Sequence, residues 1–322
     1  MKRILVLTSG GDAPGMNAAI RAVVRTGHFY GIEMFGTAYG FQGLVDRSIF
    51  PLIPANVANC IQHGGTILKT GRCLAFHEFS ERLKCRDFLK EQNIDGLIII
   101  GGDGSFKGAS LLSSEGGPKV VGIPATIDND IVGTTYTLGY DTARNTALEA
   151  IDKIRDTAFS HDRHFLVEVM GRHSGFLALD VGIAGGAEFI LTPEFPLSVE
   201  ELAAKITAPR RTKANSIIVI AEDDHPGRSM GIADALRAIT GLQYRVCILG
   251  HTQRGGSPTT LDRKMGSQMG FLAVKSLMEG ANHRMVALQA ERLTLCEFPD
   301  PDAGARILTD RDLLDINSIL CS

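Results

Sequence analysis

Short apolar, β-branched runs alternate with longer helical patterns along this chain of 322 residues. The apolar runs are nearly continuous, which is typical of strands that helices cover on both faces, as in parallel sheets. The predicted strands are Ile4–Thr8, Leu97–Ile100, Val120–Ile123, Phe165–Met170, Ile217–Ala221, Val246–Leu249 and Met285–Leu288. The predicted helices are Met16–His28, Ser105–Leu112, Thr142–Phe159, Val199–Ala208, Ile232–Ile239 and Leu261–Met278. This alternation predicts an α/β protein with doubly wound, mostly parallel sheets.

The bulk composition is ordinary for a soluble globular protein and argues against several classes of function. Hydrophobic residues make up 44% of the chain and charged residues 21%, and the formal net charge is -3. A weakly acidic balance argues against a general nucleic-acid binder. The six cysteines form no C-x-x-C pair and no metal-like spacing, which favours reduced thiols.

The chain starts with basic and then apolar residues, but the apolar stretch ends at Ser9–Asp12, so it is typical of a strand and not of a signal peptide. No apolar run approaches the length of a bilayer span, and we expect a cytoplasmic protein with no membrane partner.

Two runs, one of glycines around an acid and one with two acids, follow predicted strands and suit a site for phosphate and metal. They are Gly101–Ser105 and Thr126–Asp130. Backbone N–H groups at the carboxyl ends of parallel strands can approach anionic oxygens, and a carboxylate there can hold Mg²⁺ or accept a proton. Asp103 is the candidate Mg²⁺ ligand. Asp128 and Asp130 are two positions apart, so in an extended segment they face one way, one as the proton acceptor and the other near the metal. A solvated polar turn is the alternative for each run.

Three further glycine-rich turns repeat the theme. Thr8–Asn17 joins the first strand to the first helix, where bare amides and a helix start favour an anion. This turn is neither a Walker A loop nor a G-x-G-x-x-G fingerprint. Met170–Gly175 carries Arg172, whose guanidinium suits the charge that develops on a transferring phosphoryl group. Leu249–Pro258 places a histidine and an arginine beside glycines, which suits a second phosphate. Taken singly, each is also explained as a structural turn or a surface charge.

Together these segments resemble the bacterial ATP-dependent 6-phosphofructokinase family. The resemblance spans nearly the whole chain in the family's order and thins after about Glu291. Its matching runs are Leu7–Arg21, Gly101–Ser105, Thr126–Asp130, Val167–Arg172, Ala184–Phe189, Glu222 and Gly250–Pro258. The resemblance implies a homotetramer of two-lobed α/β subunits with the active site in the cleft between two Rossmann-like lobes. By the same analogy the ATP lobe is 1–138 plus 252–300, and the fructose 6-phosphate lobe is 139–251 plus 301–322.

The resemblance also assigns roles to individual residues. Positions that bind ATP are Gly11, Arg72, Cys73, Gly102, Asp103, Gly104 and Ser105, with Asp103 on Mg²⁺. Asp128 falls on the catalytic base, and Thr126 and Arg172 fall on groups that stabilise the transferring phosphoryl. Positions that bind fructose 6-phosphate are Met170, Gly171, Glu222, His251 and Arg254 of the same subunit, and Arg163 and Arg245 of a neighbouring subunit. The implied reaction phosphorylates D-fructose 6-phosphate at its 1-hydroxyl, giving fructose 1,6-bisphosphate and ADP, the committed step of glycolysis.

The chain departs from the family pattern at a few positions. Phe41, Cys73 and His77 stand where the bacterial enzymes usually have a tyrosine, an aromatic residue and an arginine, which affects the adenine side. An effector site for ADP or phosphoenolpyruvate is implied by Arg21, Arg25, Arg155, Gly186, Glu188, Arg211 and Lys213. Pro54 and Asn215 replace an arginine and a histidine of that site, so a weak response to both effectors is expected.

Two other functions are weighed against this one. The pyrophosphate-dependent branch of the family typically has an aspartate at the position of Gly104 and a lysine at that of Ala125. Both residues are small here, which leaves room for the α-phosphate of ATP. A non-catalytic sugar-phosphate sensor would keep the arginines but would have no reason to keep both Asp103 and Asp128.

Overall fold

The structure is a computed structural model that describes residues 1–208, 215–223, 227–300, 306 and 311–321. The chain forms two compact units, which we describe separately. Unit 1 comprises Met1–Thr126, Ile131–Thr142 and Arg254–Gly304, and unit 2 comprises Ile127–Asp130, Ala143–Gln253 and Ala305–Ser322. The sequence predicted lobe boundaries after residues 138, 251 and 300, and the units divide slightly later, after residues 142, 253 and 304. The assignment of 127–130 to unit 2 was not expected.

Unit 1 contains a seven-stranded sheet in the order β11-β10-β5-β4-β1-β2-β3. Its strands are β1 (Arg3–Ser9), β2 (Glu33–Gly36), β3 (Phe50–Pro51), β4 (Gly96–Gly101), β5 (Lys119–Pro124), β10 (Arg284–Gln289) and β11 (Arg292–Glu297). The five inner strands run parallel, and the two edge strands β3 and β11 are antiparallel to their neighbours. Every residue of β4 is buried, which explains its continuous apolar run.

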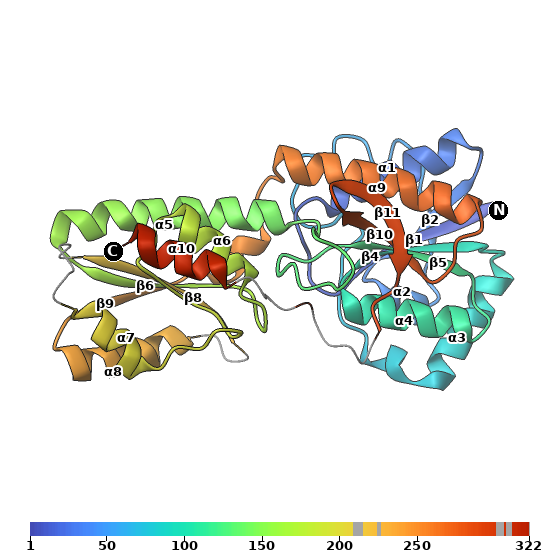
Figure 1. The fold of residues 1–322 in the computed structure, drawn as a ribbon. Coiled ribbons are helices and arrows are strands. Elements are labelled where there is room, and N and C mark those ends of the chain that lie inside the picture. The colour runs from blue at the N-terminus through green and yellow to red at the C-terminus, as the bar shows by residue number, and fades with distance from the viewer. Residues whose placement is uncertain (209–214, 224–226, 301–305, 307–310, 322) are drawn as a thin grey trace. The chain divides into compact units, whose positions relative to one another are not determined.

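Helices cover both faces of this sheet (Figure 1). The helices of unit 1 are α1 (Met16–Phe29), α2 (Phe41–Val45), η1 (Leu74–His77), α3 (Phe79–Glu91), α4 (Asp103–Ser114) and α9 (Thr260–Met278). Helices α1 and α9 lie side by side on one face, while α2, α3 and α4 pack on the other around Phe106 and Leu89. At Gly270 a Cβ atom would lie 2.6 Å from the carbonyl oxygen of Ala19, so the close approach of α1 and α9 requires glycine there.

Unit 2 contains a four-stranded parallel sheet in the order β7-β8-β6-β9. Its strands are β6 (His164–Val169), β7 (Phe189–Leu191), β8 (Ser216–Ala221) and β9 (Tyr244–Ile248). Its helices are α5 (Tyr140–His161), whose first residues belong to unit 1, α6 (Phe176–Ala184), α7 (Val199–Ile206), α8 (Arg228–Thr240), η2 (Gly250–Arg254) and α10 (Asp312–Leu320). Within this unit, α5, α6 and α10 lie on one face of the sheet and α7 and α8 on the other (Figure 1).

The doubly wound, mostly parallel α/β class predicted from the sequence is confirmed, and each predicted strand and helix is present. The bounds differ by up to four residues: β6, for example, ends at Val169, and α8 begins at Arg228. A capping box begins α7: the Ser198 hydroxyl accepts from the Glu201 N–H at 3.1 Å, and the Glu201 carboxylate accepts from the Ser198 N–H at 2.9 Å. Several elements were not predicted, namely β2, β3, β7, β11, α2, α3, α6 and α10. Among the described residues, no helix combines the length and apolarity of a membrane span.

Candidate active site

The loop from β1 to α1 packs against Arg254 in unit 1. Gly10 and Gly15 have φ values of 87° and 100°, which only glycine adopts without strain. The Arg254 Nη1 donates to the carbonyl oxygen of Asp12 at 3.3 Å. A Cβ atom at Gly11 would lie 2.4 Å from that same Nη1. The structure therefore brings a predicted ATP residue, Gly11, next to a predicted sugar-phosphate residue, Arg254.

A second segment, residues 70–73, lies next to this loop and contains two residues that were predicted to bind ATP. The Thr70 hydroxyl donates to the carbonyl oxygen of Gly10 at 2.9 Å, which places the following residues Arg72 and Cys73 near the loop. Arg72 is exposed, whereas Cys73 is half-buried and its thiol donates to Gln42 Oε1 at 3.3 Å. The segment from 70 to 73 therefore presents one exposed cation and one partly covered thiol.

A buried ion pair fixes η1, which follows Cys73. Arg82 and Glu115 pair at 2.7 Å with side chains 8% and 14% exposed. Arg82 also donates to the carbonyl oxygens of Phe76 and His77, at 3.1 and 2.7 Å. The Phe76 ring stacks on Phe41, with centroids 4.1 Å apart. His77 itself is exposed, so its side chain is available to solvent.

Asp103 stands at the start of α4, directly after β4. Gly102 is the N-cap residue in an extended conformation, and its carbonyl oxygen accepts from the N–H groups of Ser105 and Phe106 at 3.0 and 3.1 Å. The first turn of a helix presents N–H groups and a positive dipole end, which attract anions. Gly104 is exposed, and nothing lies within 4 Å of the place a Cβ atom would take. This turn therefore presents the N–H groups of a helix start and open space beside one carboxylate.

Asp128 lies in a non-helical turn that follows β5 and belongs to unit 2. Asn129 has a φ of 52°, which lies in the left-handed region. The carbonyl oxygen of Asp128 accepts from the Ser174 hydroxyl at 3.0 Å. Burial raises the pKa of the neighbouring Asp130 carboxyl, and the positive charges of Arg172 and His173 partly oppose this rise. Asp128 and Asp130, which are close in sequence, therefore lie in a partly buried environment with cations nearby.

Thr126 closes the other end of this segment in unit 1. Its carbonyl oxygen accepts from the Thr137 hydroxyl at 2.7 Å, and the preceding Ala125 N–H donates to Gly101 at 3.0 Å. Ala125 is 2% exposed, so its side chain faces the protein interior. These two bonds fix the path of the backbone as it leaves β5.

The turn after β6 presents Arg172. Gly171 has a φ of 148°, and a Cβ atom there would lie 2.4 Å from the carbonyl oxygen of Ser174. The Ser174 N–H donates to the carbonyl oxygen of Gly171 at 2.8 Å and closes the turn. Arg172 is exposed at its tip and has a φ of 52°. Glycine is thus required before Arg172, and the tight turn displays the guanidinium.

Further predicted sugar-phosphate residues gather at the same end of the unit 2 sheet. The Met170 N–H donates to Gln253 Oε1 at 3.4 Å, and the Glu222 N–H donates to the carbonyl oxygen of Val169 at 2.8 Å. Met170 and Glu222 therefore follow β6 and β8 side by side. His251 lies exposed in η2, which follows β9. Gln253, a buried contact of this group, was not singled out from the sequence.

Arg163 and Arg245 lie at the other end of the same sheet. Arg163 immediately precedes β6, and Arg245 pairs in register with Phe165 near the start of β6. Both are exposed. The structure of unit 2 therefore does not bring these two arginines together with Met170, Glu222 or Arg172.

The predicted effector residues fall in both units. Arg21 and Arg25 lie on α1 in unit 1, whereas Arg155, Gly186 and Glu188 form a cluster in unit 2. Arg155 Nη2 donates to the carbonyl oxygen of Gly186 at 2.7 Å, and Arg155 Nη1 lies 3.7 Å from Glu188. Arg211 and Lys213 lie outside the described residues.

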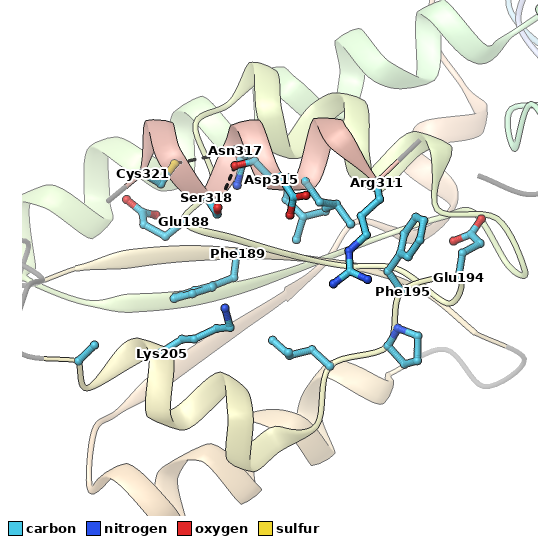
Figure 2. A pocket seen from close by; sticks show the side chains of 15 residues that line it. Glu188, Phe189, Glu194, Phe195, Lys205, Arg311, Asp315, Asn317, Ser318 and Cys321 are labelled. Carbon is cyan, nitrogen blue, oxygen red and sulfur yellow. Dashed lines mark hydrogen bonds between the residues drawn. The ribbon is translucent and has the colours of Figure 1, made fainter. Parts of the chain in front are cut away.

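A cavity of about 610 Å³ lies beside this cluster in unit 2, between β7, α7 and α10 (Figure 2). Lys205 and Arg311 point into it from α7 and from the residue before α10. Glu188 lines it as well, while none of the described residues predicted for ATP, metal or sugar binding does. Helix α10 is attached here because Asn317 Nδ2 donates to the carbonyl oxygen of Ala187 at 2.9 Å.

Comparison with known proteins gives a consistent result. The family model described as "Phosphofructokinase" matches residues 3–277. The chain is 56% identical over 322 residues to an ATP-dependent 6-phosphofructokinase of Coxiella burnetii, covering 100% of this chain and 99% of that protein. It is 54% identical over 287 residues to ATP-dependent 6-phosphofructokinase 1 of Thermus thermophilus, covering 89% of each.

Solved structures agree on the fold. A phosphofructokinase from Saccharomyces cerevisiae superposes with a TM-score of 0.85 at 35% identity. The alignment covers 92% of this chain but 44% of the yeast chain, so this chain spans less than half the length of that relative. A pyrophosphate-dependent phosphofructokinase from Marinobacter aquaeolei has a TM-score of 0.83 at 21% identity, which shows a shared fold only.

Proposed function

The chain belongs to the phosphofructokinase family, and we propose that it transfers the γ-phosphoryl group of ATP to the 1-hydroxyl of D-fructose 6-phosphate. The products are ADP and fructose 1,6-bisphosphate, and the reaction is a step of glycolysis. The observation that carries the proposal is the 56% identity, over the full length of both chains, to a protein named ATP-dependent 6-phosphofructokinase. The cytoplasmic location stays a prediction from the sequence.

We assign ATP to the turns of unit 1. The start of α4 offers N–H groups and a positive dipole end for phosphate oxygens, together with Gly102, Gly104 and Ser105. Gly11 and the exposed Arg72 belong to segments that hydrogen bonds hold next to each other. Cys73 would face the nucleotide on the adenine side, where its small side chain leaves more space than the aromatic residue usual in the family.

Asp103 is the proposed Mg²⁺ ligand, and the donor set fits this ion. Among the described residues, no group of three or more histidine, cysteine, aspartate or glutamate side chains could hold a metal alone. Mg²⁺ in nucleotide sites is usually held by one or two carboxylates plus substrate phosphates, so a single carboxylate beside a phosphate site suffices. When bound, the ion offsets negative charge on the phosphates.

The chemical step is assigned to Asp128, Thr126 and Arg172. Asp128 accepts the proton of the sugar 1-hydroxyl as that oxygen attacks the γ-phosphorus in line, and the ADP oxygen leaves from the opposite side. The exposed guanidinium of Arg172 and the Thr126 hydroxyl stabilise the transferring group. Little covalent chemistry is left to the protein, so positioning and electrostatics provide most of the rate.

Fructose 6-phosphate is assigned to Met170, Gly171, Glu222, His251 and Arg254. Arg163 and Arg245 stand at the far end of the unit 2 sheet from Met170 and Glu222. This separation supports the proposal that they bind the 6-phosphate of a neighbouring subunit in a homotetramer. ADP or phosphoenolpyruvate is proposed to act at Arg21, Arg25, Arg155, Gly186 and Glu188, with Arg211 and Lys213 outside the described residues.

The phosphoryl donor separates this proposal from the pyrophosphate-dependent branch. Gly104 leaves open space at the start of α4, and Ala125 adds no charge. Both features favour ATP.

The test is a coupled assay for fructose 1,6-bisphosphate with saturating fructose 6-phosphate and Mg²⁺, comparing ATP with pyrophosphate. We expect turnover with ATP and none above background with pyrophosphate. Turnover with pyrophosphate alone would place the chain in the other branch, and turnover with neither donor would contradict the proposed reaction.

A further inference from the structure

The turn that carries Asp128 offers three successive backbone carbonyl groups to the rest of unit 2, and each accepts a hydrogen bond. The Asp128 carbonyl accepts from the Ser174 hydroxyl at 3.0 Å, and the Asn129 carbonyl accepts from Arg306 Nη1 at 3.4 Å. The Asp130 carbonyl accepts from the Arg306 backbone N–H at 2.6 Å. Because three neighbouring carbonyl groups are held by hydrogen bonds, the turn cannot rotate without breaking several of them.

The local sequence alone does not hold this turn in place. Asn129 is buried and has a φ of 52°, a left-handed conformation that is sparsely populated for residues other than glycine. Such conformations persist where the surrounding structure determines them. Ser174 and Arg306 supply such contacts from outside the turn, so these two residues are external supports of it.

Arg306 is itself fixed in position. Its guanidinium carbon lies 4.3 Å from the centroid of the Phe176 ring, at the first residue of α6. A guanidinium on an aromatic face is held by a cation–π interaction, and its planar fork is already oriented for hydrogen bonding. Arg306 therefore connects α6 to the turn, although it is distant from the turn in sequence.

Ser174 connects the two turns of the proposed chemical step. It is 1% exposed, and its N–H closes the turn that presents Arg172 while its hydroxyl holds the turn that presents Asp128. A displacement of either turn would therefore be transmitted to the other. The distance between the proposed base and the proposed cation therefore depends in part on Ser174.

We propose that Arg306 and Ser174 are positioning residues for phosphoryl transfer, which act by fixing the backbone that carries Asp128. The inference rests on the proposed function, in which Asp128 is the general base. A general base has to lie within hydrogen-bond reach of the proton it accepts, and a misplacement of about 1 Å can cost about 100-fold in rate. The two residues then affect turnover without touching either substrate.

The test compares single variants whose folding is checked by thermal melting. Arg306→Met keeps the side-chain length and the backbone N–H but removes the guanidinium, and we expect it to lower kcat about 10- to 100-fold. Arg306→Lys should fall between Arg306→Met and the unchanged protein. Ser174→Ala removes a single oxygen atom and should lower kcat about two- to tenfold, the value of one hydrogen bond. The KM values for ATP and fructose 6-phosphate should stay within about twofold, because neither residue binds them.

Two controls separate positioning from a general loss of structure. Arg311 is a cation in the same C-terminal segment, but it has no hydrogen bond to the turn. Arg311→Met should therefore leave kcat unchanged. In a protein that already carries Asp128→Asn, Arg306→Met should lower the residual rate by less than about twofold, because no base is left to misplace.

The outcomes distinguish this inference from the function on which it rests. An Arg306→Met protein with unchanged kcat, or one that loses the same factor with and without Asp128, would overturn the positioning role. If Arg306→Met does not fold, Ser174→Ala replaces it in the same comparison. An unchanged kcat, or the same loss of rate with and without Asp128, would again overturn the positioning role. Near-native turnover of the Asp128→Asn single variant would instead overturn the proposed base, and with it this inference, before any Arg306 variant is considered.

Discussion

The turn that carries Asp103 and the turn that carries Asp128 follow two paired strands, β4 and β5, yet they are built in different ways. The first is local: a glycine N-cap and the first turn of α4 satisfy each other's backbone groups within a few residues. The second depends on side chains 46 and 177 positions away in the sequence. The comparison indicates that local sequence forms the proposed anion site, whereas tertiary contacts fix the proposed base.

The largest expected effect tests the second turn. Asp128→Asn keeps the shape of the side chain but removes its ability to accept a proton, so kcat should fall about 10²- to 10⁴-fold. The melting temperature and the KM for fructose 6-phosphate should change little. Steady-state kinetics and thermal melting measure both. If turnover stayed near native, Asp128 would not be the base, and the distinction between the two turns would lose its functional meaning.

The first turn is tested by a charge at Gly104. Because nothing lies within 4 Å of a Cβ atom there, Gly104→Asp should fold normally. The added carboxylate would repel the phosphates of ATP, and a like-charge contact of a few kcal/mol corresponds to about a 10- to 100-fold loss in kcat/KM for ATP. Gly104→Ala is the matched control and should keep the activity, since it adds the Cβ without the charge. Equal kinetics for Gly104→Asp and Gly104→Ala would remove this turn from the nucleotide site.

A third carboxylate sharpens the comparison, because it is buried within unit 1 and has no proposed role in the reaction. Asp262 is 0% exposed and accepts from the Tyr136 hydroxyl, the Gly139 N–H and both the N–H and the hydroxyl of Thr142, at 2.5 to 2.9 Å. Asp262→Asn replaces one acceptor oxygen by a donor, and each donor left without an acceptor costs about 1–3 kcal/mol. We therefore expect reduced stability with little change in the kcat of the folded protein. Chemical denaturation measures the loss, and Glu279→Gln on the exposed end of α9 serves as the neutral control.

The same substitution should change the pH dependence of stability. Burial raises the pKa of the Asp262 carboxyl, and the hydrogen bonds it accepts oppose this rise. A raised pKa in the folded state means that folding favours the protonated form. The contribution to stability is therefore greatest below the unfolded pKa of about 3.9 and is lost as the pH rises through the folded value. Stability of Asp262→Asn should decline less over that range, and parallel curves for the two proteins would contradict the shift.

The smallest expected effect concerns regulation. Pro54 supplies neither a cation nor an N–H donor where the family pattern has an arginine, and the lost contact is worth about 1.5–3 kcal/mol, or about 10- to 100-fold in effector affinity. ADP and phosphoenolpyruvate should therefore shift the fructose 6-phosphate saturation curve only weakly. Pro54→Arg is expected to restore part of the response. Strong shifts at micromolar effector in the unchanged protein would show that other residues replace the missing arginine.

Most of the fold could be predicted from the sequence because its inner strands are buried on both faces. The residues of β4 and β8 are all buried, and their continuous apolar runs are visible without any structure. The elements that were missed lack such a signal. Strand β7 has three residues, and α6 is apolar except for Asp180, so neither shows a clear helical or strand period.

The candidate site divides in the same way. Glycine and acid at a strand end identify the Asp103 turn, because the strand, the N-cap and the helix start are consecutive. Arg306 has no local signal, since its significance comes from meeting Asn129 and Phe176 only in the folded chain. The proposed positioning residue Arg306 was missed because it acts on the backbone of another segment.

The order of the segments along the chain has a consequence for biosynthesis. Unit 1 is assembled from three separated stretches, and its strand β5 obtains its outer neighbour β10 only from the third. A ribosome adds about 5–20 residues per second, so the edge of β5 stays uncovered for roughly 10–30 s after it is synthesised. The turn that carries Asp128 lacks its hydrogen bonds from Arg306 for longer still. Nascent chains of this protein should therefore reach the native arrangement only after β10 and Arg306 have been synthesised, and neither unit could be transplanted between genes as one continuous piece.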